Sequence, residues 1–200
     1  MIDRFVPYIG IIMVKNNVKE YPRYEIPDGY EFVMYQDGFE KYWAELETSV
    51  GEFDEYEKAL GYFKKEFMSK KELLPDRCSF IRTTGGEFAA TASVWPGDTF
   101  GKIQDKIHWV CVHPGHQGNG LAKAVLTQAM HIFNSIGKDD MTYLTTQTNS
   151  YKAINIYRKF GFRIYTGPKP ASWKCQETWE EDLYKAKEII NEKIQEYQNR

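Results

Sequence analysis

Residues 112–126, with the sequence VHPGHQGNGLAKAVL, constrain the fold of this 200-residue chain more than any other stretch. Gly115, Gly118 and Gly120 fall within six residues, and an apolar, helix-forming run follows without a break. Glycine lowers helix propensity and costs backbone entropy, so three of them before a helix indicate that the backbone lies close to something. Because a helix start offers unpaired N–H groups and a partial positive charge, the stretch is typical of a phosphate-binding loop. A tight turn at Asn119-Gly120 is the alternative that this motif alone leaves open.

The segments on either side of the loop predict a parallel β-α-β unit, because a strand, a helix and a second strand follow one another. The strands are expected at residues 107–112 and 141–147, and the helix carries an apolar face from Leu121 to Ile136. Further strands are expected at residues 30–35, 79–83, 88–95 and 162–165, with a hairpin turn at 84–87 and a short helix before Gly161. This order of elements predicts one α/β or α+β domain over residues 1–200.

Two amphipathic helices are predicted before the hairpin. Apolar side chains recur at steps of four, three and four at Phe39, Trp43, Leu46 and Val50, and again at Tyr56, Leu60, Phe63 and Phe67. Capping boxes are expected at Asp37 with Glu40 and at Asp54 with Glu57. The same segment carries the carboxylates Glu40, Glu45, Glu47, Glu52, Asp54, Glu55 and Glu57, which are predicted to form a solvated helix face and caps rather than a cation site. The aromatic residues Trp43, Phe53 and Tyr56 are predicted to belong to the core.

The two ends of the chain add an extra strand at residues 5–14 and a charged helix at residues 177–199. The N-terminal apolar run is interrupted by Pro7 and is too short to span a bilayer, and it lacks the leader of a signal peptide. The C-terminal helix is a candidate surface for a homodimer, and packing on its own domain is the alternative that stays open.

The overall composition argues against several function classes. The formal charge is −2, with 26 basic and 28 acidic residues, so neither a nucleic acid nor a membrane surface is an expected partner. Three widely spaced cysteines match no disulfide or zinc pattern, which favours a reducing, cytoplasmic location. His108, His113 and His116 match no metal-binding spacing, and no metal is expected.

Two common nucleotide-binding motifs do not fit the loop. Gly115 and Gly120 have the spacing of a P-loop, but Leu121 and Ala122 stand where lysine and serine or threonine are required. A dinucleotide fingerprint starting at Gly118 would need its third glycine at Lys123.

A third pattern fits both the loop and a later motif. Gln117-Gly118-Asn119-Gly120-Leu121-Ala122 matches Gln/Arg-x-x-Gly-x-Gly/Ala, and NSYKAINIYRKFGF places Asn149, Ala153, Tyr157, Gly161 and Phe162 in the order Asn…Ala…Tyr…Gly-Phe. Together these motifs resemble the GNAT superfamily of acetyl-CoA-dependent N-acetyltransferases. The resemblance is sharpest over residues 107–162. It implies a GNAT-like α+β fold, with a mixed, mostly antiparallel sheet flanked by helices around a central β-α-β unit that binds acyl-CoA.

The resemblance also implies where acetyl-CoA binds and what the chain does with it. Backbone N–H groups of Gln117, Gly118, Asn119, Gly120, Leu121 and Ala122 are expected to bind the pyrophosphate, those of Val110, Cys111 and Val112 the pantetheine arm, and Asn149 the coenzyme from a neighbouring strand end. The expected activity is acetyl transfer to a primary amine of a small molecule or peptide, by direct attack in a ternary complex. A non-catalytic module that binds coenzyme A as a sensor or protein partner is the alternative.

The chemistry needs a proton donor for the thiolate and a base for the amine. The resemblance names Tyr157 as the donor, and a phenol pKa of about 10 against about 8.5 for a thiol is compatible with this role. Strand 107–112 contains no carboxylate, so His108 is the candidate base, with a histidine satisfied by its neighbours as the alternative. Cys111 has no base to pair with in this interpretation and is expected to be a small apolar core residue rather than a nucleophile.

Overall fold

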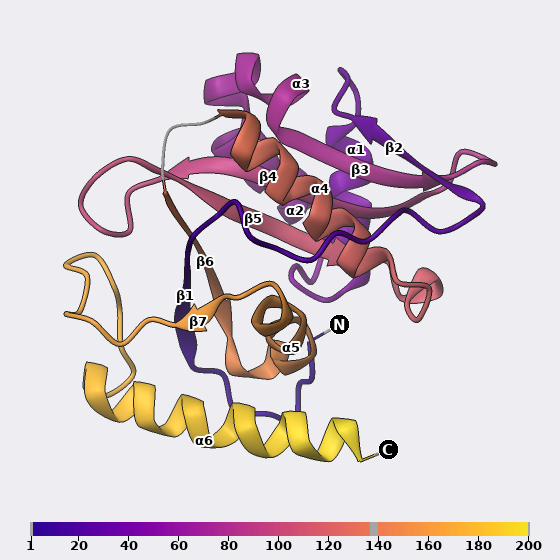
Figure 1. The fold of residues 1–200 in the computed structure, drawn as a ribbon. Coiled ribbons are helices and arrows are strands. Elements are labelled where there is room, and N and C mark those ends of the chain that lie inside the picture. The colour runs from indigo at the N-terminus through magenta and orange to yellow at the C-terminus, as the bar shows by residue number, and fades with distance from the viewer. Residues whose placement is uncertain (1, 137–139, 200) are drawn as a thin grey trace. The chain divides into compact units, whose positions relative to one another are not determined.

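The computed structural model describes residues 2–136 and 140–199. Their tertiary contacts group the chain into two compact units, and Figure 1 shows the elements of both. The first unit comprises residues 23–95 and 107–136, and the second comprises residues 2–22, 96–106 and 140–199. The single domain expected over residues 1–200 stays a prediction.

The first unit contains four strands in the order β2-β3-β4-β5. They are β2 (Tyr30–Met34), β3 (Cys78–Thr83), β4 (Phe88–Gly97) and β5 (Gln104–Val112), of which residues 96–97 and 104–106 are counted in the second unit. Strand β3 pairs antiparallel with β2 and with β4, and its pairing with β4 confirms the predicted hairpin. Since β5 is the last strand of this unit, its outer edge has no strand partner within the unit.

Helices cover both faces of these strands. They are α1 (Glu40–Ser49), α2 (Tyr56–Glu66), the 3-10 helix Met68–Leu73, α3 (Leu74–Arg77), the 3-10 helix Pro114–His116 and α4 (Leu121–Ile136). Figure 1 shows α4 in front of β3 and β4, with α1 and α2 behind the strands. The predicted helices are confirmed, but their N-caps are Phe39 and Glu55 rather than Asp37 and Asp54, and neither Phe39 nor Glu55 makes a side-chain cap hydrogen bond. Glu40 instead accepts hydrogen bonds from the Tyr35 hydroxyl at 2.9 Å and the Gly38 N–H at 3.0 Å.

Aromatic side chains dominate the core behind β3 to β5. Trp43, Phe53, Tyr62 and Trp109 all contact one another, with every pair of ring centroids between 5.1 and 6.2 Å apart. These separations lie within the usual range for aromatic pairs. Trp43 is fully buried, and Phe53 and Tyr56 pack half-buried against the same core. The prediction that these aromatic residues belong to the core is therefore confirmed.

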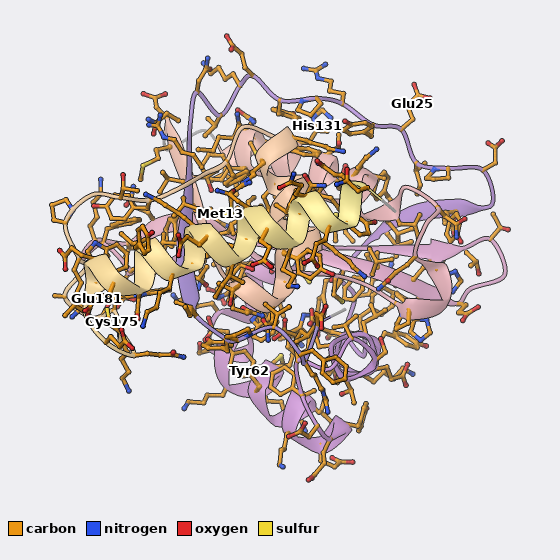
Figure 2. All side chains as sticks on the ribbon, turned by 90° about the horizontal axis from the view of Figure 1, so that it is seen from below. Met13, Glu25, Tyr62, His131, Cys175 and Glu181 are labelled. Atoms are coloured by element: carbon orange, nitrogen blue, oxygen red, sulfur yellow. The ribbon has the colours of Figure 1, made fainter. Side chains whose placement is uncertain are left out.

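The second unit is built around the N-terminal strand. It contains β1 (Gly10–Asn16), β6 (Met141–Gln147), the 3-10 helix Thr148–Ser150, α5 (Tyr151–Lys159), β7 (Arg163–Ile164) and α6 (Trp179–Gln198). Strand β1 pairs antiparallel with β6 on one side and with β7 on the other. The fully buried Met13, labelled in Figure 2, lies at the centre of β1 opposite Leu144 and Ile164.

The extra N-terminal strand is confirmed, but its predicted bounds of 5–14 are wrong. The strand begins at Gly10, because Pro7 has no N–H to give to a ladder, and it continues to Asn16 opposite Met141. The Lys15 side chain is buried near its end and donates a hydrogen bond to the Glu20 carbonyl at 2.6 Å. Helix α6 confirms the predicted C-terminal helix to within two residues.

Strand β1 with β6 and β7, and β3 with β2 and β4, pair antiparallel, whereas β5 and β6 pair in parallel at Lys106 and Tyr143. The predicted fold class, a mixed and mostly antiparallel sheet flanked by helices with a parallel β-α-β unit, is confirmed. Among the described helices, none has both the length and the apolar character that a bilayer span requires.

Candidate functional site

The glycine loop connects β5 to α4 in the first unit. Gly118 has a φ of +87° and Gly120 a φ of +82°, a left-handed region that glycine enters without steric cost. A Cβ on Gly118 would meet no atom within 4 Å, so the backbone angle and not crowding within the chain requires glycine there. The two glycines therefore set the path of the loop into the helix.

The start of α4 presents backbone N–H groups that the described chain leaves without hydrogen-bond acceptors. The N–H groups of residues 118–122 have no hydrogen-bond partner among the described residues, and residues 118–120 are exposed. The first turn of α4 also carries no acidic side chain. Five free N–H groups at a helix start, together with the helix dipole, form a site suited to an anion.

Side chains of the loop brace it against the rest of the unit. His116 Nδ1 lies 3.0 Å from the Tyr30 hydroxyl, and His116 Nε2 lies 3.2 Å from a carboxylate oxygen of Glu87. The Asn119 amide donates to the His116 carbonyl at 3.1 Å, and His113 Nδ1 accepts the Gly115 N–H at 3.2 Å. These histidines shape the loop, which leaves the backbone N–H groups as its free donors.

Strand β5 is irregular just before the loop. Trp109 has a φ of +50°, which is unusual for a residue with a large side chain and carries a strain of roughly 1–3 kcal/mol. Its ring packs in the aromatic core, as Cys111 does two residues later. Residues 110–112 follow on the outermost strand of the unit, and the Val112 carbonyl accepts a hydrogen bond from the Gln117 side chain at 3.1 Å.

Glu47 on α1 contradicts the prediction of a solvated acidic face. Its side chain is only 1% exposed, and it accepts a hydrogen bond from the Cys111 thiol. Its Oε1 has no hydrogen-bond partner among the described residues. Burial, and to a lesser extent the nearby charge of Glu52, raise the pKa of Glu47 to about 8. One signal in the sequence pointed to this burial: Glu47 follows Trp43 by four residues and shares its helix face.

Cys111 is paired with a carboxyl group, so the expectation that it has no neighbouring base was wrong. Burial first, and then the charge and hydrogen bond of Glu47, hold the pKa of the Cys111 thiol well above its ordinary value. A thiol that keeps its proton is a poor nucleophile. The expected role of Cys111 as a small core residue is therefore compatible with its surroundings.

His108 also lies on the core side of β5. Its Nε2 is 3.5 Å from a carboxylate oxygen of Glu66 on α2, and its ring centroid is 6.0 Å from that of Phe67. The His108 side chain is 11% exposed and the Glu66 side chain 33% exposed. The surroundings of His108 thus include a neighbouring acid, and both its role as base and the alternative of a satisfied histidine stay predictions.

Tyr157 and Asn149 belong to the second unit. Tyr157 lies on α5, is 7% exposed, and packs with its ring centroid 6.2 Å from that of Phe162. The Phe162 N–H donates to the Tyr157 carbonyl at 3.0 Å, and Gly161 ends the helix with a φ of +86°. Asn149 follows β6, and its Oδ1 is buried without a hydrogen-bond partner among the described residues. An unsatisfied buried amide oxygen is uncommon and fits a residue that awaits a ligand.

Comparison with protein-family models identifies residues 35–162 as a match to the acetyltransferase (GNAT) family. The chain belongs to this family. GNAT proteins are acetyltransferases, and membership implies the use of acetyl-CoA and an amine acceptor. The resemblance inferred from the two sequence motifs is thereby confirmed. A comparison with curated protein sequences returned no match.

Solved GNAT structures share the fold of this chain at low sequence identity. A GCN5-related N-acetyltransferase from Sphaerobacter thermophilus matches with a TM-score of 0.63 and 18% identity, over 80% of this chain and 49% of that one. A GNAT-family acetyltransferase from Colwellia psychrerythraea matches with a TM-score of 0.60 and 13% identity, over 82% and 55%. A tandem GNAT protein from the clavulanic acid biosynthesis pathway matches with a TM-score of 0.57 and 16% identity, over 82% and 52%. This chain thus spans about half the length of these structures.

In the first unit of this GNAT chain, the loop offers free N–H groups that suit a pyrophosphate. In the second unit, Asn149 offers an unsatisfied amide oxygen. Among residues 2–136 and 140–199, no group of three or more His, Cys, Asp or Glu side chains could hold a metal ion. A hollow of about 230 Å³ also opens in the first unit between α1, the β3–β4 hairpin and His113.

Proposed function

We propose that this GNAT chain transfers the acetyl group of acetyl-CoA to a primary amine of a small molecule or peptide, by direct attack in a ternary complex. The observation that carries the proposal is the start of α4, where five N–H groups lie free behind two glycines with positive φ. When bound, acetyl-CoA supplies an activated thioester. The acceptor and the mechanism are both proposed, because the solved GNAT structures are similar to this chain in fold alone.

The coenzyme would bind along the path that the first unit provides. The free N–H groups of Gly118, Asn119, Gly120, Leu121 and Ala122 would donate to the pyrophosphate, whereas the Gln117 N–H, also expected to do so, donates to the Pro114 carbonyl at 3.4 Å. Backbone groups of Val110, Cys111 and Val112 would pair with the pantetheine arm as an added strand does. The family resemblance also assigns Asn149 to the coenzyme, and its unsatisfied amide oxygen supports this role.

Two side chains are proposed to move protons. Tyr157 would protonate the departing thiolate, since a phenol pKa of about 10 lies close enough to that of a thiol for transfer within the site. An alkylammonium with a pKa of about 10.4 is almost fully protonated at pH 7, so a base must remove a proton before attack. The sequence predicts His108 as this base.

A coenzyme-binding module without catalysis is the second candidate. It would keep the loop and the edge of β5 but would release no thiol in the presence of an amine. The buried, unpaired Oε1 of Glu47 beside β5 favours catalysis, because a binding module has no need for a desolvated carboxyl group there.

The test of coenzyme binding is thermal unfolding with and without acetyl-CoA, with ATP and NAD as controls. A ligand at 100 times its dissociation constant adds about 2.7 kcal/mol to the free energy of unfolding. For a chain of this size the melting temperature then rises by roughly 5–10 °C. A rise with acetyl-CoA alone supports the loop assignment, and no rise at millimolar acetyl-CoA refutes it.

The test of catalysis is Tyr157→Phe, which keeps the ring and removes the proposed proton donor. Turnover should fall by about 10²-fold or more, while the thermal shift with acetyl-CoA stays unchanged. Equal turnover in the variant would remove Tyr157 from the mechanism.

A further inference from the structure

Glu47 is a buried carboxyl group without a structural reason to be there. One of its oxygens has no partner, the other contact is a weak donor, the Cys111 thiol, and the side chain is 1% exposed. A carboxylate loses a large hydration free energy on burial, and protein interiors rarely leave such an atom unpaired. An apolar side chain would stabilise α1 at this position, so the carboxyl group calls for a functional explanation.

The position of Glu47 relative to β5 suggests what that function is. If the pyrophosphate lies at residues 117–122 and the arm at residues 110–112, the acyl end of the coenzyme reaches the part of β5 next to Trp109. Trp109 and Cys111 both point into the core that contains α1, and Cys111 contacts Glu47 directly. Glu47 therefore lies on the side of β5 that faces α1, beside the expected place of the thioester.

We propose that Glu47 is the catalytic base that takes the proton of the attacking amine. The inference rests on the proposed function and replaces His108 in that one role. His108 has an acidic neighbour 3.5 Å from its Nε2, whereas Glu47 Oε1 is free to accept a proton.

The acid–base properties of Glu47 are compatible with this role. Burial first, and then the charge of Glu52, raise its pKa to about 8 against the lowering effect of the hydrogen bond from Cys111. Burial raises the pKa values of Tyr62 on α2 and Cys78 on β3, and the charge of Glu47 adds a smaller increase to both. A base with a pKa closer to that of an amine accepts its proton more readily than an ordinary carboxylate does.

The chemistry of the base also indicates the class of acceptor. The ammonium group of an aliphatic primary amine, with a pKa of about 10.4, is almost fully protonated at pH 7 and needs a base before attack. The acceptor is thus an aliphatic primary amine.

The transfer balances with Glu47 as the first proton acceptor. The carboxylate takes one proton from the ammonium group, and the neutral nitrogen forms a bond to the thioester carbonyl carbon. The carbon–sulfur bond breaks, and its electron pair leaves with the sulfur. The nitrogen loses a second proton while the thiolate gains one, so the products are the N-acetyl amine and the coenzyme thiol, and Glu47 passes its proton to solvent.

The test is the pH dependence of kcat/KM between pH 6 and 10, with acetyl-CoA and a panel of n-butylamine, cadaverine, tyramine and lysine amide. In the wild type, kcat/KM should rise with an apparent pKa near 8, the value for Glu47, and not only near that of the free amine. Glu47→Gln should lower kcat/KM by about 10²–10⁴-fold and abolish this rise, with the acetyl-CoA thermal shift unchanged. The matched control is Glu57→Gln, which removes an exposed carboxylate from α2 and should leave the profile as in the wild type.

Three results would overturn the inference while the proposed coenzyme binding stands. They are a Glu47→Gln variant with wild-type turnover, a His108→Gln variant that alone removes the rise near pH 8, and a wild type that binds acetyl-CoA yet acetylates none of the four amines. Absence of an acetyl-CoA thermal shift in the wild type would instead refute the proposed function. If Glu47→Gln does not fold, the carboxyl ¹³C titration of Glu47 in the wild-type protein decides, because a pKa near 4.5 excludes the role.

Discussion

The starts of α4 and α6 show two opposite ways to treat the free N–H groups of a helix. At α6, Thr178 accepts the Glu181 N–H at 3.2 Å, and Glu181 accepts the Thr178 N–H at 3.2 Å in return. The first turn of α6 carries three acidic residues, whereas the first turn of α4 carries none. Figure 2 marks Glu181 at the capped start of α6. The first N–H groups of α6 are thus capped by side chains of the same helix, whereas those of α4, which would bind the coenzyme, have no such cap.

The largest expected effect comes from changing the backbone conformation of the loop before α4. Gly118→Ala with Gly120→Ala places a Cβ at two positive φ angles, each costing roughly 1–2 kcal/mol. The loop should relax in the free variant, and the coenzyme must then restore it. Acetyl-CoA affinity measured by calorimetry should fall by about 30- to 700-fold.

Gly38→Ala is the matched control for this variant. Gly38 has a φ of +95° and precedes α1, away from the loop in the sequence. Its variant should lose stability but keep the affinity for acetyl-CoA. An unchanged affinity in the double loop variant would mean that the glycines do not serve the coenzyme.

The next largest effect is expected when the first turn of α4 receives an acidic side chain, as the first turn of α6 already has. Ala122→Glu places a carboxylate in the first turn of α4, where it should stabilise the free protein by about 0.3–1 kcal/mol through the helix dipole. The same charge repels a pyrophosphate, so acetyl-CoA affinity should fall by about 5-fold, and less at high salt. Ala122→Gln separates size from charge, and an equal loss with glutamine would argue against a phosphate at this helix start.

The reverse change removes the side-chain cap at the start of α6. Thr178→Ala removes the acceptor for the Glu181 N–H and should cost about 1 kcal/mol of unfolding free energy, or roughly 2–4 °C in melting temperature. Acetyl-CoA affinity should not change. Thr178→Ser keeps the hydroxyl and should behave as the wild type, and a loss of stability as large as that of the alanine variant would show that the cap is not the cause.

The smallest expected effect is the response of the α6 cap to acid. Hydrogen bonds from the Thr178 side chain, and then from its backbone, hold the pKa of Glu181 below its ordinary value of 4.5. A lowered pKa in the folded state means that the carboxylate stabilises the fold above pH 4.5 and that this contribution disappears as the pH falls through the folded-state pKa. The difference in melting temperature between wild type and Glu181→Gln should therefore vanish in acid, and a difference that persists at low pH contradicts this origin.

The caps also show how far local sequence signals extend. Asp37 with Glu40 and Asp54 with Glu57 have the spacing of capping boxes, yet α1 and α2 have Phe39 and Glu55 as their N-caps, without a side-chain cap hydrogen bond. Thr178 with Glu181 has the same spacing and does form a capping box. The difference lies in the tertiary structure around each helix start, since Glu40 finds a partner in the Tyr35 hydroxyl.

The sequence by itself determined the helices, the strands on both sides of the loop, the loop and the family, because periodicity, glycine placement and motif spacing are local properties of a chain. The tertiary structure decided that β1 lies between β6 and β7, and that Glu47 is buried against Cys111. Strand neighbours and desolvated charges depend on residues far apart in the sequence. An amphipathic pattern shows which side of α1 faces the core, but only the packed structure shows that a carboxyl group lies there too.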